Sequence, residues 1–136
     1  MENSRDKQDG ICTQQQYEEG AQKIADWASN EKFNSIYAIP TGALTLGQRL
    51  HNLLEIPLLL HEEDITRDTL IVDDIVHTGG RLERLFNARG TGYRVAVLFL
   101  NTKEATLRPD YFVYETEVWI RFPWETEKSS RRDGTR

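Results

Sequence analysis

The sequence predicts an α/β domain with three layers, in which helices flank a parallel sheet on both faces. Strand-like segments alternate along the chain with segments whose apolar residues recur at helical spacing. Most of the strand-like segments are continuous apolar runs, which is typical of parallel strands that are buried on both sides. The length of 136 residues suits one domain with one packed core.

The helices and strands of this domain follow from local patterns. The first helix begins at Thr13, which forms a capping-box pattern with Gln16, and carries apolar residues on one face as far as Ala28. Two further helices are predicted over residues 44–54 and 81–88. The predicted strands cover residues 35–39, 58–60, 70–76 and 94–100, followed by short aromatic segments at 111–114 and 118–122.

The predicted domain runs from residue 11 to residue 124, and both ends of the chain are expected to be flexible tails. Residues 1–10 are charged and have no apolar stretch, so no signal peptide is expected. Residues 125–136 contain no apolar side chain. The longest apolar run, residues 56–60, is too short to span a membrane, and a single cysteine excludes a disulfide framework. A cytoplasmic location is therefore expected.

Charge and topology together narrow the class of ligand. Seventeen basic and 22 acidic residues give a net charge of −5, which argues against duplex nucleic acid as the main partner. A small anion remains compatible, because backbone amides bind phosphate without a basic protein. Ligands of parallel sheets bind at the carboxyl ends of the strands. The predicted loops at those ends are residues 40–43, 77–80 and 101–104.

Two adjacent acids interrupt the most apolar of the predicted strands. Residues 69–81 read TLIVDDIVHTGGR, which places Asp73 and Asp74 inside the run. Neighbouring strand residues point to opposite faces, so at least one carboxylate is expected to face a covered side of the sheet. Because buried unpaired charges are costly, we expect the pair to accept hydrogen bonds from hydroxyl groups or to hold a metal ion. A solvated strand end is the alternative, and it is disfavoured because Ile75 and Val76 resume the apolar pattern.

A small turn follows the acids and leads into a helix. Residues 77–80, HTGG, form this turn, and a glycine-rich turn at a helix start presents backbone N–H groups to an anion. The acids can bind sugar hydroxyl groups or Mg²⁺, and the adjacent backbone amides can bind a phosphate. Together these groups indicate a sugar-phosphate site. Other nucleotide motifs are absent, since there is no Walker pattern and residues 90–92 lack the third glycine of a dinucleotide fingerprint.

Residues 69–81 resemble the 5-phosphoribosyl-1-diphosphate (PRPP) binding motif of type I phosphoribosyltransferases. The resemblance extends over most of residues 11–124 and is closest to the xanthine-guanine and hypoxanthine enzymes. Residues 35–50, SIYAIPTGALTLGQRL, stand where that family has its diphosphate-binding loop. Residues 99–125, with the segments RPDY, VWI and FPWE, resemble the aromatic purine-binding end of these enzymes.

This resemblance implies transfer of the phosphoribosyl group of PRPP to an oxopurine (hypoxanthine, guanine or xanthine), with Mg²⁺ as the cofactor and diphosphate as the second product. The residues implied to bind PRPP are Thr41, Gly42, Asp73, Asp74, Thr78, Gly79, Gly80 and Arg81. The residues implied to take part in catalysis are His77, Asp73 and Asp74, of which Asp74 also contacts the metal. The residues implied to bind the base are Lys103, Trp119 and Ile120. Family members usually form dimers or tetramers, so a homo-oligomer is expected.

The chain departs from the family pattern at four places. His77 stands where the purine enzymes usually have an aspartate near N7 of the base, which is proposed to act as a general base. A neutral imidazole also accepts a proton, so His77 either substitutes for the aspartate or reshapes the base pocket. Thr41 replaces a cation that usually meets the diphosphate. Arg81 replaces a small hydroxyl residue, and it either contacts phosphate or points into solvent.

The fourth departure is the short connection at residues 61–68, HEEDITRD, where the family usually has a long mobile hood loop over the reacting centre. The leading prediction remains a purine phosphoribosyltransferase that is involved in purine salvage. A non-catalytic protein that binds PRPP or a nucleotide is the alternative, favoured by Thr41, His77 and the missing hood. An enzyme acting on a different base or ring amine is a third possibility, because His77 alters the base pocket.

Overall fold

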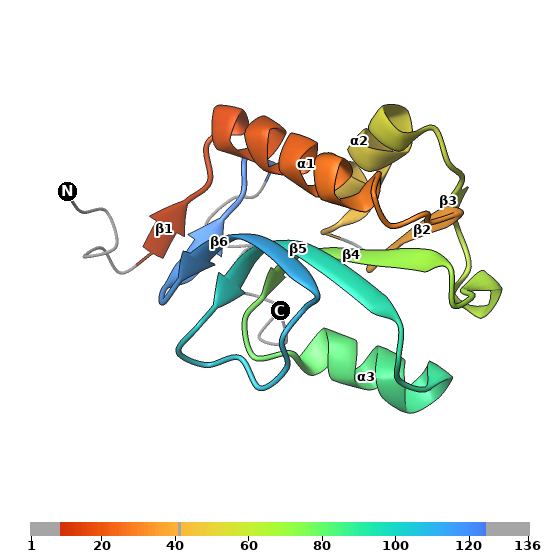
Figure 1. The fold of residues 1–136 in the computed structure, drawn as a ribbon. Coiled ribbons are helices and arrows are strands. Elements are labelled where there is room, and N and C mark those ends of the chain that lie inside the picture. The colour runs from red at the N-terminus through yellow and green to blue at the C-terminus, as the bar shows by residue number, and fades with distance from the viewer. Residues whose placement is uncertain (1–8, 41, 125–136) are drawn as a thin grey trace.

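The computed structural model describes residues 9–40 and 42–124, and its centre is a five-stranded sheet (Figure 1). The strand order is β3-β2-β4-β5-β6, and every neighbouring pair is parallel. The strands are β2 (Ser35–Ala38), β3 (Leu58–Leu59), β4 (Thr69–Val76), β5 (Arg94–Asn101) and β6 (Tyr111–Thr116). The α/β class and the parallel sheet predicted from the sequence are confirmed.

Helices cover both faces of this sheet. Helices α1 (Gln14–Ala28) and α2 (Leu44–Leu54) lie on one face, and α3 (Gly80–Arg89) lies on the other (Figure 1). The predicted capping box at the start of α1 is present, because the side chains of Thr13 and Gln16 each accept a hydrogen bond from the other residue's backbone N–H. The three-layer arrangement is therefore also confirmed.

Burial of the central strands explains their continuous apolar sequence. All eight residues of β4 are buried, as are the last seven residues of β5. One apolar core packs α1 and α2 against the sheet, and a second packs Leu82 and Leu85 of α3 against its other face. A strand that contributes side chains to two cores has no polar face, as expected for parallel sheets.

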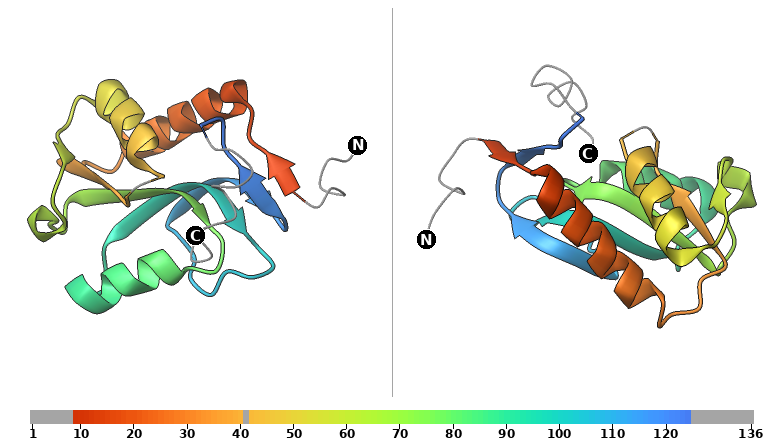
Figure 2. Two further views of the ribbon diagram at one scale, coloured as in Figure 1. Left: turned by 180° about the vertical axis from the view of Figure 1, so that it is seen from behind. Right: turned by 90° about the horizontal axis from the view of Figure 1, so that it is seen from above.

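A second, two-stranded sheet joins the two ends of the described chain. Strand β1 (Asp9–Ile11) pairs in parallel with β7 (Trp119–Arg121) (Figure 2). The first strand thus begins two residues before the expected domain start at residue 11. Its three residues have no strand pattern of their own, and their conformation depends on pairing with a distant segment. A Cβ atom on Gly10 would lie 2.5 Å from Cδ1 of Ile120, so the small residue permits close packing there.

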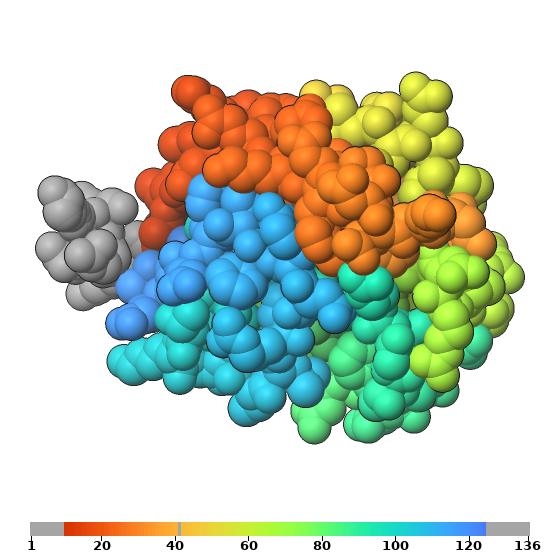
Figure 3. All heavy atoms as spheres, viewed as in Figure 1, coloured from red at the N-terminus to blue at the C-terminus, as the bar shows by residue number. Residues whose placement is uncertain are grey.

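The surface of the molecule also shows segments from the two ends of the chain lying together. In the space-filling view, α1 and β6 lie side by side over one face (Figure 3), and the hydroxyl of Tyr114 donates a hydrogen bond to the carbonyl oxygen of Gln16. The expected tails, residues 1–8 and 125–136, lie outside the described residues. Within the described ranges, no helix has the length and apolar character needed to cross a membrane.

The connection between β3 and β4 is short. It contains one turn of 3-10 helix, η2 (Glu62–Asp64), followed by Ile65, whose side chain is buried in the core on the α3 face. Residues 61–68 therefore fold back onto the domain instead of extending over the carboxyl edge of the sheet. The structure agrees with the expected absence of a long loop between these strands.

Candidate functional site

Three loops that are far apart in sequence meet at the carboxyl edge of the central strands. They follow β2, β4 and β5, which are neighbours in the sheet. Direct contacts connect the second and third loops: Nδ2 of Asn101 lies 3.2 Å from Nδ1 of His77, and the backbone N–H of Thr106 donates to the carbonyl oxygen of Thr78 at 2.9 Å. The loop after β2 joins them through Gly42, which lies against Asp74. The predicted meeting of these loops is observed.

The two acids of β4 have different neighbours. Asp73 faces α3, where its Oδ1 accepts a hydrogen bond from the backbone N–H of Asp74 at 2.8 Å and lies 3.3 Å from Nη1 of Arg81. Asp74 faces the loop after β2, where a Cβ on Gly42 would come within 3.0 Å of its Oδ2. Both residues are 1% exposed, which excludes the alternative of a solvated strand end.

Asp74 is a buried carboxylate whose two oxygens have no hydrogen-bond partner among the described residues. A buried polar group without a partner is unusual in a folded protein and is often explained by a ligand. The charge of Asp74 affects a neighbouring thiol. Burial is the main reason that the pKa of Cys12 is raised to about 12, and the negative charge of Asp74 is the second. Burial also raises the pKa of Asp73 well above its ordinary value; the charge of Asp74 raises it further, and Arg81 lowers it.

The turn after β4 has the conformation expected of an anion site. Gly79 has a φ of 103°, a left-handed conformation that favours glycine, and it caps α3 without a side-chain hydrogen bond. Thr106 holds the turn from outside, since its backbone N–H and its hydroxyl both donate to the carbonyl oxygen of Thr78, each at 2.9 Å. The N–H of Gly80, the first residue of this ten-residue helix, donates to the Thr78 hydroxyl at 3.3 Å, and a helix start behind a glycine turn favours binding of a phosphate.

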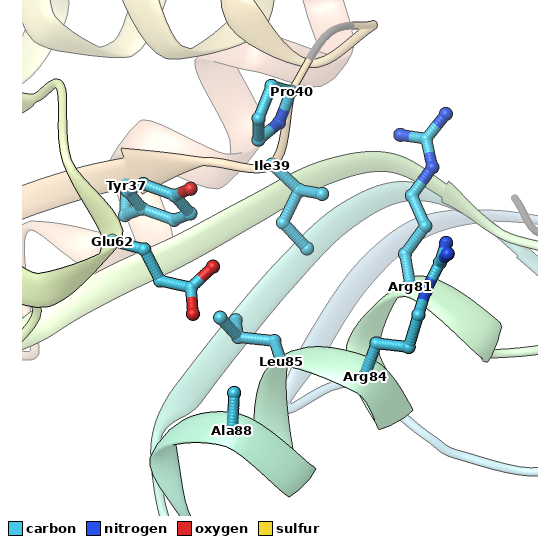
Figure 4. Close-up of a pocket in the computed structure, with 8 residues that line it drawn as sticks. All are labelled: Tyr37, Ile39, Pro40, Glu62, Arg81, Arg84, Leu85 and Ala88. Atoms are coloured by element: carbon cyan, nitrogen blue, oxygen red, sulfur yellow. The ribbon is translucent and has the colours of Figure 1, made fainter.

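Two arginines of α3 extend the site beyond the acids. Arg81, whose side chain is 10% exposed, reaches Asp73 and does not simply point into solvent. It also borders a cavity of about 490 Å³ between α3 and the end of β2. Figure 4 shows Arg84 rising from α3 beside Arg81, with Tyr37 and Glu62 across the cavity. The sequence analysis missed Arg84; its position one turn after the glycine-rich loop is the signal that could have revealed it.

The residues expected to bind the purine base differ in how close they lie to His77. The rings of Trp119 and His77 form a T-shaped pair, with 5.1 Å between the ring centroids and an angle of 64°. Nε2 of His77 lies 3.6 Å from Oε1 of Glu104. Lys103 is exposed on the adjoining loop, whereas the Ile120 side chain is buried in the core. Thr41, the other residue expected at the site, lies outside the described residues.

Comparison with known proteins identifies the fold. No protein-family model matches the chain, and no curated protein matches it significantly. A purine phosphoribosyltransferase from Pyrococcus horikoshii OT3 has a similar structure, with a TM-score of 0.74 and 26% identity over 88% of this chain and 95% of that chain. The chain has the fold of the type I phosphoribosyltransferases, and the predicted resemblance to this family is confirmed.

Two further structures share this phosphoribosyltransferase fold. One is a xanthine-guanine-hypoxanthine phosphoribosyltransferase from Helicobacter pylori, with a TM-score of 0.72 and 17% identity over 89% of this chain and 96% of that one. The other is a hypothetical protein from Neisseria gonorrhoeae with bound ppGpp, with a TM-score of 0.73 and 18% identity over 93% of this chain and 95% of that one. At these identities the likeness concerns the fold.

The acid pair of this chain fits a divalent metal that is shared with a phosphate-bearing ligand. Among the described residues, no group of three or more His, Cys, Asp or Glu side chains forms a metal cluster. Mg²⁺ is commonly bound by one or two carboxylates together with substrate phosphates and water. Asp74 meets this requirement: its two buried oxygens have no hydrogen-bond partner within residues 9–40 and 42–124, and Gly42 leaves room beside it.

Proposed function

We propose that the protein transfers the phosphoribosyl group of PRPP to an oxopurine, giving a nucleoside 5′-monophosphate and diphosphate. One observation carries the proposal: the buried carboxylate of Asp74 has no hydrogen-bond partner among the described residues, and the glycine-rich turn that leads into α3 begins three positions later, at His77. The carboxylates can accept hydrogen bonds from sugar hydroxyls, and the adjacent backbone amides can donate to a phosphate. This combination matches ribose 5-phosphate, the part that PRPP and the product share.

In this proposal, Asp73 and Asp74 bind the 2′- and 3′-hydroxyl groups of the ribose. Thr78, Gly79 and Gly80 bind the 5′-phosphate through backbone amides at the start of α3. Asp74 holds Mg²⁺, which when bound offsets the negative charge of the diphosphate. The C1′–oxygen bond to diphosphate breaks, the bond from C1′ to a purine nitrogen forms, and the proton of that nitrogen passes to solvent or to the departing diphosphate. Fixed carboxylates on a rigid strand suit the positive charge that develops on the ribose ring.

The diphosphate meets the loop at residues 40–43 and the arginines of α3. The family resemblance implies that Thr41 and Gly42 approach it. Arg81 and Arg84 border the neighbouring cavity and supply the positive charge that an arginine or lysine in place of Thr41 would otherwise provide. Charge-assisted contacts of this type contribute about 1.5–3 kcal/mol each.

The base binds at the other side of the ribose. Trp119 stacks on the purine ring, Lys103 donates to the exocyclic oxygen at C6, and the backbone of Ile120 contacts the opposite edge. Residues 61–68 are too short to cover this centre, so a neighbouring subunit of a homo-oligomer excludes water in our proposal. We place the reaction in the cytoplasm, with PRPP and a purine base as the partners.

A product assay tests the proposal. The protein is incubated with PRPP, Mg²⁺ and, separately, hypoxanthine, guanine, xanthine and adenine, and chromatography detects the nucleoside monophosphate. Product from an oxopurine, and none from Asp74→Asn, would support the reaction. Absence of product with every base, from folded protein, would refute it.

A second candidate function is binding of PRPP or a purine nucleotide without catalysis. The histidine at position 77 favours it, since an aspartate at this place is the family's proposed general base. The ppGpp-bound relative from Neisseria gonorrhoeae has the same fold and holds a guanine nucleotide. Calorimetry with PRPP and with nucleotides distinguishes the candidates: tight binding without turnover supports the second.

A further inference from the structure

The side-chain amide of Asn101 has only one possible orientation. Asn101 ends β5 and is fully buried, with 0% exposure. Its Oδ1 accepts hydrogen bonds from the backbone N–H groups of Lys103 and Glu104, both at 2.9 Å. A backbone N–H is always a donor, so the atom that faces these two groups is the amide oxygen. Turning the amide round would place N–H groups against N–H groups.

The amide nitrogen of Asn101 therefore faces His77. Nδ2 lies 3.2 Å from Nδ1 of His77, and an amide nitrogen can only donate hydrogen bonds. Nδ1 must then be the acceptor, which puts the proton of a neutral imidazole on Nε2. The carboxylate of Glu104 lies on that side, with Oε1 3.6 Å from Nε2; this is beyond hydrogen-bond distance, but the negative charge favours a proton on Nε2. Asn101 and Glu104 favour the same tautomer.

We propose that Asn101 is a positioning residue that holds His77 as the Nε2–H tautomer, so that the base pocket presents a hydrogen-bond donor to the ligand. The atom of the ligand that meets His77 is then an acceptor. This inference rests on the proposed function for the purine nature of the ligand. N7 of a purine nucleotide is an acceptor, whereas a free purine protonated at N7 presents a donor.

The consequence concerns both the role of His77 and the preferred ligand. A nitrogen that carries a proton cannot accept another. His77 therefore donates a hydrogen bond to the ligand and does not act as a general base. An aspartate at position 77 would present only acceptors when ionised, so the histidine reverses the polarity of this contact. The pocket consequently favours a purine nucleotide over the N7-protonated free base.

NMR of the complete chain tests the tautomer without any ligand. Two-bond ¹H–¹⁵N spectra report which nitrogen of each histidine carries the proton, and His77→Gln identifies the signals of His77 among the three histidines. We expect an acceptor-type shift at Nδ1 and a protonated Nε2 at neutral pH. In Asn101→Asp, one carboxylate oxygen still accepts the two backbone N–H groups while the other faces Nδ1, so Nδ1 should become protonated. A protonated Nδ1 in the unaltered protein would overturn the proposal.

Binding of a purine nucleoside 5′-monophosphate and its 7-deaza analogue tests the contact. The analogue has a C–H group in place of N7, and we expect it to bind about two- to tenfold more weakly, the range for one hydrogen bond. This difference should vanish in His77→Ala and persist in His61→Ala, which alters an exposed histidine. Equal affinities in the unaltered protein would overturn the contact. Failure of every purine nucleotide to bind would instead refute the proposed function, and the NMR result would still decide the tautomer.

Discussion

Nη1 of Arg81 lies 3.3 Å from Oδ1 of Asp73, so helix α3 places a cation against one of the two acids of β4. The side chains are 10% and 2% exposed, which makes this a buried ion pair. Removing one partner of such a pair leaves the other charge without compensation. The glycine turn between β4 and α3 brings the two residues together, although eight positions separate them.

We expect Arg81→Gln to destabilise the protein by about 2 kcal/mol, because Asp73 loses the cation that favours its ionised form. Arg49→Gln is the matched control, since Arg49 pairs with Glu18 at 2.8 Å but both side chains are about 40% exposed. Exposed pairs contribute about 1 kcal/mol or less. Urea unfolding of both variants measures the difference, and equal losses would contradict the argument.

Stability of the ligand-free protein should fall as the pH rises from the ordinary carboxyl pKa of about 3.9 through the raised pKa of Asp73. Within this window, the native state keeps a proton on Asp73 that the unfolded chain has lost, so raising the pH favours unfolding. Thermal unfolding in the presence of a chelator, from pH 4 to pH 8, measures the trend. Because other groups also titrate, the test is the difference from Asp73→Asn, which should depend less on pH. Parallel curves for the two proteins would contradict the raised pKa.

Asp74→Asn should abolish Mg²⁺-dependent binding of PRPP while leaving the ligand-free protein at least as stable. The substitution removes a buried charge whose oxygens have no hydrogen-bond partner in the described part of the chain, and it relieves the repulsion felt by Asp73. Asp68→Asn, at an exposed position, is the control and should change neither property. Calorimetry and thermal unfolding give the two readouts. Unchanged PRPP affinity in Asp74→Asn would remove this residue from the site.

Arg84→Gln should weaken binding of diphosphate and PRPP by about tenfold or more while leaving the affinity for a nucleoside monophosphate unchanged. The reason is its place beside Arg81 at the cavity next to the loop after β2, on the side assigned to diphosphate. Arg89→Gln, near the other end of α3, is the control because its Nη2 donates to the carbonyl oxygen of Glu63. Equal weakening of all ligands in Arg84→Gln would indicate a general effect of charge.

Gly47→Ala should destabilise the protein by about 1–3 kcal/mol, because an added Cβ would lie 2.7 Å from Cβ of Ala38 and 3.0 Å from Cδ1 of Leu58. Helix propensity alone would stabilise α2 by about 1 kcal/mol, so a loss reports the contact between α2 and β2. Thr45→Ala, at an exposed position of the same helix, should be nearly neutral. Chemical unfolding measures both variants. A gain in stability for Gly47→Ala would show that α2 is loosely packed.

The sequence alone determined the α/β class, the order of the helices and strands, and the segment from Asp73 to Gly80. These features are local: apolar periodicity records which faces are buried, and a strand, a turn and a helix start that follow one another in the chain lie together in space. The acids could therefore be assigned to a sugar-phosphate site before their surroundings were known.

Only the tertiary structure decided the features that join distant residues. The pairing of β1 with β7, the place of Arg84 at the cavity and the orientation of the Asn101 amide toward His77 all depend on segments that are remote in sequence. A three-residue strand carries no periodic signal, and an amide shows no preferred orientation until its hydrogen-bond partners are in position. Long-range packing supplies those partners, and for this reason the polarity of the base pocket could not be predicted from the sequence.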